Sequence, residues 1–229
     1  MSSAGREPPA TEGRVARPCR GGYRGPMIHR SVLSATVLAV TAGCGTYSLV
    51  RPAETLRAGK VELAAGLAVS AIGEANTIVH GAVGITDDIE VLAQNEIWNT
   101  FVEGRFGLLH DRDDGLSLAV GLGGGQAVTL VSAIGDELDS DTADSGAAGL
   151  ASVSVGKRLG AFELTLGNRT FVQADGNFFM SSTRAAVRAS IGDHFGLMLE
   201  GGGTVHAPID NPDLSLFIGE GSAGFWVGF

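Results

Sequence analysis

The last eleven residues of the chain read Gly219-Glu220-Gly221-Ser222-Ala223-Gly224-Phe225-Trp226-Val227-Gly228-Phe229. Large apolar side chains occupy every second position at the end of this stretch, at Phe225, Val227 and Phe229, and the positions between them are mostly small. An alternation with a period of two is the pattern of a β-strand whose two faces differ. The chain therefore ends in a predicted strand with one apolar face.

The same period runs through the body of the chain from Lys60 onward. It is clear at Leu116, Leu118, Val120 and Leu122, whose intervening positions are serine, alanine and glycine. Ten such segments are predicted, near residues 60–71, 76–85, 89–98, 101–110, 115–130, 148–157, 161–173, 183–191, 195–206 and 214–229.

One of these segments is open to a second interpretation. In residues 183–191, Arg184 and Arg188 stand four apart, as on one face of a helix. Val187, Ala189 and Ile191 fit a period of two at least as well.

The connections between the segments alternate in length. Four are tight and rich in turn-forming residues, at 86–88, 110–115, 156–160 and 192–194. The others are longer, at 73–76, 95–100, 131–146, 174–182 and 207–213. Short turns at one end and longer loops at the other are typical of a transmembrane barrel, with the short turns in the periplasm. We therefore predict an all-β domain over residues 58–229, an antiparallel transmembrane β-barrel of about ten strands that the last strand closes against the first.

The alternation also predicts which side chains face the lumen. The apolar set would face lipid, and a mixed set of acids and bases would point inward, with Glu90 and Glu96 among them. The predicted lumen network consists of Lys60, Glu62, His80, Glu103, Arg105, Glu163, Arg169, Arg184, Arg188, Glu200, His206 and Glu220. A soluble barrel would instead bury the apolar face and expose the charged one, and periodicity alone does not separate the two.

Aromatic residues add a second indication of a membrane. Phe162, Phe195, Phe225 and Phe229 lie near the short-turn end of their segments. A second group lies at the long-loop end and consists of Trp98, Phe101, Phe171, Phe178 and Phe179. Two aromatic belts are expected at the two interfaces of a membrane barrel.

The front of the chain has a different composition. Residues 1–26 carry five arginines and no apolar period, and we interpret them as a disordered upstream extension. From Met27, a short apolar stretch leads to Ala42-Gly43-Cys44, and a run of this length suits a signal peptide, not a membrane span. Residues 27–43 are thus the predicted signal. The small residues before Cys44 resemble the lipobox of bacterial lipoproteins, which implies that Cys44 is the lipidation site and that residues 44–57 form a linker. The alternative is a plain cleaved signal with an unmodified cysteine. Without the leader only Cys44 remains, so no disulfide forms within the chain.

Taken together, residues 58–229 resemble small bacterial outer-membrane β-barrels, and residues 27–44 resemble a lipoprotein signal. The resemblance implies a Gram-negative outer-membrane protein that is both lipid-anchored and membrane-spanning. It also implies that Phe225, Val227 and Phe229 form the barrel-closing C-terminal signal. The implied partners are outer-membrane lipid and the barrel-assembly machinery.

Charge and motifs exclude several other classes. After residue 43 the chain has 10 Lys and Arg against 23 Asp and Glu, a net charge of −13 without a basic stripe, which argues against nucleic acid. Residues 121–126 fall one glycine short of a dinucleotide fingerprint, and no βαβ unit follows. Acidic residues crowd 136–144 without the spacing of an EF-hand, so a solvated loop is the simpler interpretation. The sequence predicts no cofactor and no metal.

The predicted function is a structural or weakly pore-forming role without catalysis, and no catalytic residue is assigned. One alternative is a barrel hydrolase acting on surface lipid or peptide, with Glu200 and His206 as acid–base groups. Another is a lipid-tethered soluble β-barrel that binds a small apolar ligand inside.

Overall fold

The computed structural model describes residues 51–73, 75–96, 99–110, 115–128, 145–174, 178–209 and 215–229. The described residues form ten strands and no helix long and apolar enough to cross a membrane. The strands are β1 (Val61–Ser70), β2 (Ala75–Gly84), β3 (Ile89–Glu96), β4 (Asn99–Leu109), β5 (Leu116–Val128), β6 (Ser145–Leu159), β7 (Phe162–Gln173), β8 (Phe178–Ser190), β9 (Phe195–Pro208) and β10 (Leu216–Gly228).

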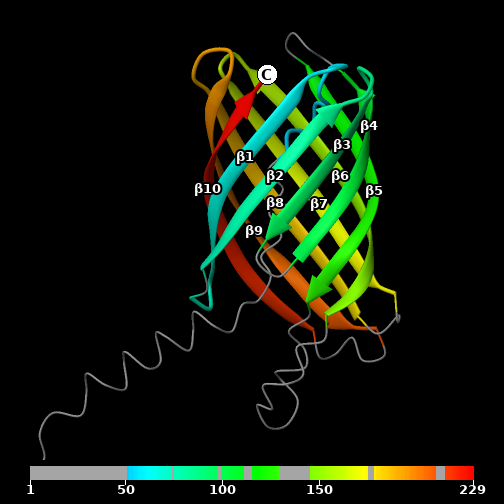
Figure 1. Cartoon of the computed structure of the whole chain (residues 1–229). Helices are drawn as coiled ribbons and strands as arrows, with labels where there is room; N and C mark the ends of the chain where they lie inside the picture. Colours follow the sequence, from blue (N-terminus) through cyan, green and yellow to red (C-terminus); the bar gives the residue numbers. More distant parts are fainter. Residues whose placement is uncertain are drawn as a thin grey trace, which may run out of the picture.

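The strands close into a barrel in which each is paired with its neighbours in sequence (Figure 1). Every pair is antiparallel, and β10 pairs with β1 from Glu62↔Gly228 to Ser70↔Glu220. Closure leaves no strand with an unpaired edge, which is the condition for a sheet to exist in lipid. The predicted all-β antiparallel barrel of ten strands is confirmed.

The eighth strand differs from its prediction. It begins at Phe178, five residues before the predicted start at Thr183, so the connection predicted at residues 174–182 is shorter than expected. The helical interpretation of residues 183–191 is wrong, because these residues pair with both β7 and β9. The alternation of buried and less buried side chains from Phe178 to Arg188 explains the longer strand.

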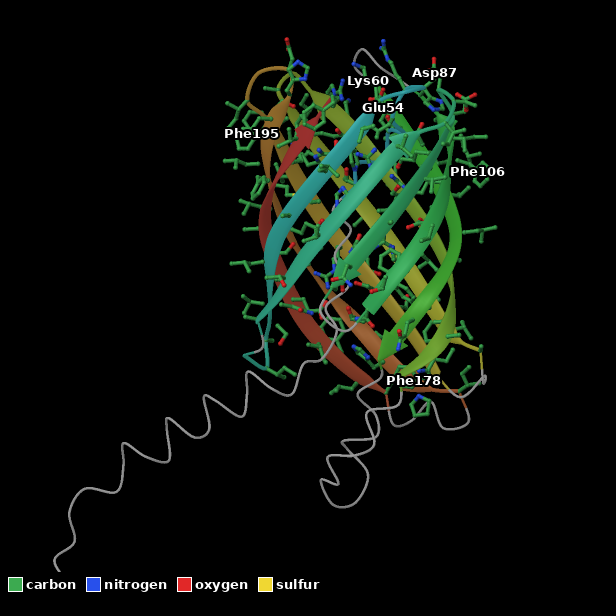
Figure 2. The ribbon with its side chains drawn as sticks, in the orientation of Figure 1. Glu54, Lys60, Asp87, Phe106, Phe178 and Phe195 are labelled. Atoms are coloured by element: carbon green, nitrogen blue, oxygen red, sulfur yellow. The ribbon has the colours of Figure 1, made fainter. Side chains whose placement is uncertain are left out.

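The outward face of the barrel is apolar and the inward face is polar. Leu67, Leu122 and Leu199 are 60%, 67% and 63% exposed, whereas Glu90 and Glu103 are fully buried. Figure 2 shows the side chains of Phe106 and Phe195 on the outside of the ribbon. A soluble barrel has the opposite arrangement, so the alternative of a soluble barrel with an apolar interior is wrong.

The barrel height also fits a bilayer. A strand of 13 residues such as β8 is about 43 Å long at about 3.3 Å per residue. Tilted by about 45°, it rises about 30 Å, the thickness of the hydrocarbon core of a membrane.

The aromatic residues form the expected belt at the short-turn end, and at the long-loop end only some of them face outward, among them Phe179 and Phe217. At the short-turn end Phe162, Phe195, Phe225 and Phe229 are exposed, as expected. At the other end Phe101, Phe171 and Phe178 are buried in a cluster inside the barrel, so the second belt is wrong for these three residues. Their positions show why. Phe101 is two residues from Glu103 and Phe171 two from Arg169, so a period of two places them on the inward face.

Several predictions fall on residues that the structure does not describe. These are the extension over residues 1–26, the signal peptide over residues 27–43, the lipidation site Cys44 and nearly all of the acidic loop. Trp98 also lies outside the described residues.

Candidate functional site: the lumen and its short-turn mouth

Residues 51–59, here called the N-terminal segment, precede β1 and enter the barrel. They enter at the short-turn mouth, the end of the barrel that holds the C-terminus and the turns before β3, β5, β7 and β9 (Figure 1). Figure 2 shows Glu54, Lys60 and Asp87 at this mouth. Ala53 is fully buried and Arg51 is 3% exposed, so the segment runs from the rim into the lumen. Residues 51–57 therefore do not form the free linker that the sequence predicts.

Arg51 anchors the segment between two strands. Its guanidinium forms a two-pronged contact with Glu90 on β3, with Nη2–Oε2 at 2.6 Å and Nε donating to Oε1 at 3.2 Å. A third contact joins Nη1 to Glu62 Oε1 on β1 at 2.7 Å. Burial lowers the pKa of Arg51, but the Glu62 and Glu90 carboxylates outweigh it and raise the pKa above its ordinary value. The guanidinium is therefore charged and firmly paired.

Glu90 binds the same segment in further ways. The Leu56 backbone N–H donates to Glu90 Oε2 at 2.8 Å, and Arg105 Nη1 donates to Oε1 at 2.5 Å. Arg105 also donates to the Pro52 carbonyl at 2.7 Å and to Ser154 at 2.8 Å. A buried carboxylate with this many donors is well compensated for its loss of water. Glu90 and Arg105 thus hold both the backbone and the side chains of the segment.

Glycines on three strands make room for the segment. A Cβ at Gly84 on β2 would overlap the Arg57 carbonyl, and one at Gly156 on β6 would lie 2.9 Å from the Ala53 Cβ. A Cβ at Gly107 on β4 would overlap the His110 ring, which hydrogen-bonds Thr55, and would lie 2.9 Å from Thr55 Oγ1 itself. Close approach of a second backbone is a recurrent reason for glycine within a strand. The barrel wall is therefore shaped to fit the segment.

Further ion pairs fill the rest of the lumen. Arg188 Nη2 lies 2.9 Å from Glu62 Oε2, and its guanidinium stacks 4.6 Å from the ring of Trp226. Arg169 pairs with Glu103 at 3.0 Å near the middle of the barrel. Arg184 pairs with Glu220, which also accepts a hydrogen bond from Thr204 at 2.8 Å.

The remaining members of the predicted lumen network lie as follows. Arg105 contacts Glu90, as described above, and His80 Nε2 lies 3.6 Å from Glu62. Glu163 lies 3.9 Å from Arg158, and Glu200 accepts a hydrogen bond from Ser222 at 3.0 Å. Lys60 precedes β1, is exposed and lines the cavity at the short-turn mouth of the lumen.

Sequence reasoning missed Arg51, which contacts two members of the lumen. It lies ten residues before β1, outside every segment with a period of two. The sequence indicates such a residue only indirectly. Glu62 and Glu90 are predicted to point inward near one end of their strands, and buried carboxylates need cationic partners.

The long-loop end of the lumen is filled by an apolar cluster. Phe101 and Phe171 meet edge to face with their ring centroids 5.5 Å apart, and Arg169 lies over the Phe101 ring at 4.7 Å. Phe178 contacts the His206 ring at a centroid distance of 6.1 Å. This cluster and the Arg184–Glu220 pair occupy the half of the barrel opposite the N-terminal segment.

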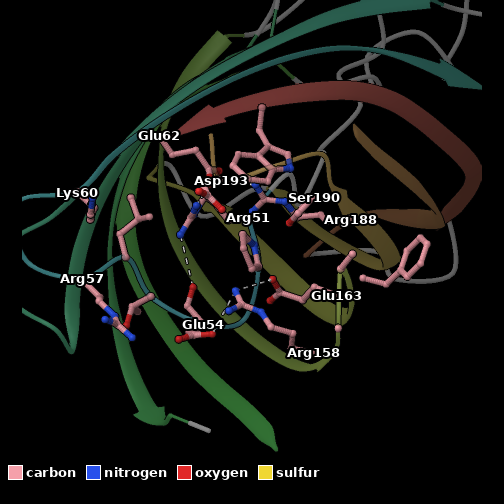
Figure 3. Close-up of a pocket in the computed structure, with 17 residues that line it drawn as sticks. Arg51, Glu54, Arg57, Lys60, Glu62, Arg158, Glu163, Arg188, Ser190 and Asp193 are labelled. Carbon is pink, nitrogen blue, oxygen red and sulfur yellow. Dashed lines mark hydrogen bonds and ion pairs between the residues drawn. The ribbon is translucent and has the colours of Figure 1, made fainter. Parts of the chain in front are cut away.

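A cavity of about 590 Å³ opens at the short-turn mouth (Figure 3). Its walls carry both signs of charge, with Arg158 and Arg188 facing Glu54 and Glu163. A separate cavity of about 10 Å³ lies among Arg51, Arg105 and Arg169 and has room for one water molecule. The large cavity is therefore confined to the mouth.

The two candidate acid–base residues do not meet. Glu200 and His206 both belong to β9 and stand six residues apart, which is about 20 Å along a strand. Neither nitrogen of His206 has a hydrogen-bond partner within the described part of the chain. Among the same residues no group of three or more His, Cys, Asp or Glu side chains could hold a metal ion. The arrangement required for the hydrolase alternative is not formed by these two residues.

No protein-family model matches the chain, and no curated protein matches its sequence. Among solved structures, it is similar to the attachment invasion locus protein Ail of Yersinia pestis, with 9% identity over 75% of this chain and 99% of that one, at a TM-score of 0.29. It is also similar to Neisserial surface protein A, with 12% identity over 74% of this chain and 95% of that one, at a TM-score of 0.18. The closed sheet, apolar exterior and charged interior make the architecture that of an outer-membrane β-barrel.

Proposed function

We propose that the protein is a structural component of a bacterial outer membrane, a non-enzymatic barrel whose lumen is closed. The observation that carries the proposal is the inside-out distribution of side chains, with exposed leucines around the barrel and buried ion pairs within it. In water such a surface would aggregate, whereas in lipid it is the stable arrangement. Closed barrels of this type are the only β-structures that span a membrane.

The contents of the lumen favour a structural role over a pore. The N-terminal segment fills the short-turn half through Arg51, and the Phe101 cluster fills the opposite half. Between them the ion pair Glu103–Arg169 crosses the interior. A barrel of about ten strands has a narrow lumen, so these three layers are sufficient to obstruct it.

A lipid on Cys44 is the finer part of the proposal. Arg51 lies seven positions after Cys44, and an extended chain spans at most about 3.6 Å per residue. A lipid on Cys44 would therefore lie within about 25 Å of Arg51, which is compatible with an anchor that acts beside the barrel.

Membrane location is tested by carbonate washing and by gel mobility. The full chain should stay with outer membranes after the wash and should migrate differently on an SDS gel before and after boiling. Release by the wash would end the membrane proposal. Radiolabelled palmitate should be incorporated into the wild type and not into Cys44→Ala, and equal labelling of both would refute the lipid site.

Closure is tested by conductance in planar bilayers. The purified full chain should insert without steady conductance steps, because three layers obstruct the lumen. The variant Arg169→Met, which opens the middle layer alone, should remain silent as well. Regular conductance steps from the wild type would refute the closed lumen and would indicate a pore.

A further inference from the structure

A polar cluster interrupts the lipid-facing surface of β7 and β8. It consists of Asn168 and Thr170 on β7 and of Ser181 and Thr183 on β8, and all four alternate with buried residues. The Asn168 amide donates to Ser181 Oγ and to Thr183 Oγ1, both at 2.9 Å, and accepts a hydrogen bond from Thr170 at 3.1 Å. The outward neighbours toward the short-turn mouth are Leu166 and Val187, as expected for lipid contact.

The cluster lies near the middle of the membrane. Asn168 is the seventh of the twelve residues of β7, six residues from Phe162 in the short-turn belt. Six residues at about 3.3 Å, tilted by about 45°, place Asn168 about 14 Å from that belt, or half of the hydrocarbon thickness. Lipid headgroups do not reach this depth, so lipid offers these side chains no hydrogen-bond partner.

One donor of the cluster remains unused. The Thr183 hydroxyl accepts from Asn168, but it donates to no atom of the described residues, and Thr183 is exposed. An unsatisfied polar group in hydrocarbon is unfavourable. A protein partner at the same depth would remove this cost.

The surface around the cluster permits close approach. Small outward residues adjoin part of the cluster, with Ala151 on β6 beside Thr170 and with Ala185 on β8 and Gly201 on β9 one step from Thr183 toward the short-turn mouth, whereas Val153 beside Asn168 is larger and 45% exposed. A Cβ built on Gly201 meets no atom within 4 Å, so the surface there is open. Small residues beside polar ones are the pattern of contacts between membrane segments, because they let two backbones come near.

We propose that this cluster is the contact surface for a second copy of the same chain. Copies of one barrel insert in the same orientation, so they meet through a two-fold axis along the membrane normal, and residues of equal depth face each other. Asn168 and Thr183 are directly paired across β7 and β8, so with strands about 4.8 Å apart and tilted by about 45° their depths differ by only about 3.4 Å. An amide and a hydroxyl are both donors and acceptors, so they are complementary to themselves.

Strand tilt restricts the contact to this patch. Strands tilted by about 45° in two facing copies cross at a steep angle, so the barrels touch over a compact area. The cluster, four side chains on two adjacent strands, has that shape. The inference rests on the proposed membrane location, and the carbonate wash tests that location separately.

The test measures association of the full chain in a density-matched detergent by sedimentation equilibrium. Wild type should form dimers, and Thr183→Val should raise the dissociation constant about tenfold, the effect of two symmetric hydrogen bonds of about 0.7 kcal/mol each. The double variant Asn168→Leu with Thr183→Val should be monomeric. Thr77→Val on β2, an exposed threonine on the opposite side of the barrel, is the matched control and should behave as wild type.

Two results would overturn the proposal. One is a wild type that stays monomeric at every concentration, and the other is an equal effect of Thr183→Val and Thr77→Val. Gel mobility before and after boiling shows whether each variant is folded. Oxidation of Thr183→Cys in membranes should give a covalent dimer that Thr77→Cys does not give, and both samples contain the same native cysteines.

Discussion

Replacing Arg51 with methionine tests whether the N-terminal segment is part of the folded barrel. The substitution keeps much of the side-chain length but leaves Glu62 and Glu90 without one of their buried cations. Removing one partner of a buried ion pair costs about 3–5 kcal/mol. Glu90 keeps Arg105 and the Leu56 N–H, and Glu62 keeps Arg188, so the expected loss is about 3 kcal/mol, at the lower end of that range.

The assay is urea unfolding of the barrel in lipid vesicles, followed by tryptophan fluorescence. With an m-value of about 2 kcal/mol/M, a loss of about 3 kcal/mol lowers the midpoint by about 1.5 M. Arg57→Met is the matched control, because Arg57 belongs to the same segment, is exposed and forms no ion pair with any described residue. It should change the stability by less than about 0.5 kcal/mol.

A double-mutant cycle assigns the effect to the contact itself. Arg51→Met combined with Glu90→Gln should show a coupling energy of about 2 kcal/mol, within the range for residues of one network. If Arg51→Met costs no more than Arg57→Met, the segment is a free linker and the reasoning about the lumen is refuted. A large loss with zero coupling would show that Arg51 acts without Glu90.

Three further changes test other parts of the structure by the same unfolding assay. Gly84→Ala should cost about 1–3 kcal/mol of stability, because the added Cβ would overlap the backbone of the N-terminal segment. Gly104→Ala is the control and should cost less than half as much, because the nearest atom to its Cβ lies 3.9 Å away. Equal costs would contradict the close packing of the segment against β2. Leu122→Lys near mid-membrane should cost about 2–4 kcal/mol and Leu159→Lys at the rim about 0–1 kcal/mol. The absence of this difference would argue against a lipid-facing surface. Phe101→Ala should lower the stability by about 3–5 kcal/mol. A loss below about 1 kcal/mol would indicate that the Phe101 side chain faces lipid and is not buried in the lumen.

The alternation of side chains predicted the strands and their two faces, and the alternating connection lengths and the aromatic residues predicted a membrane barrel. Successive side chains of a strand point to opposite faces, so the two faces follow from local geometry. The strand count, the antiparallel order and the inward position of residues such as Glu103 and Arg184 could therefore be inferred before any contact was known. The misplaced aromatic belt shows the limit of reasoning from position in a segment. Phe101 and Phe171 lie at the right height for an interface, but their parity directs them inward.

Local sequence decided the strands, their order and their two faces, because these depend on neighbours along the chain. Tertiary structure alone decided what fills the lumen. Arg51 reaches Glu90, 39 residues away, only because the closed sheet brings β1, β3 and β4 around one space. The polar cluster of β7 and β8 likewise depends on register, which places Asn168 opposite Thr183. Contacts between distant segments are properties of barrel closure, and no local period encodes them.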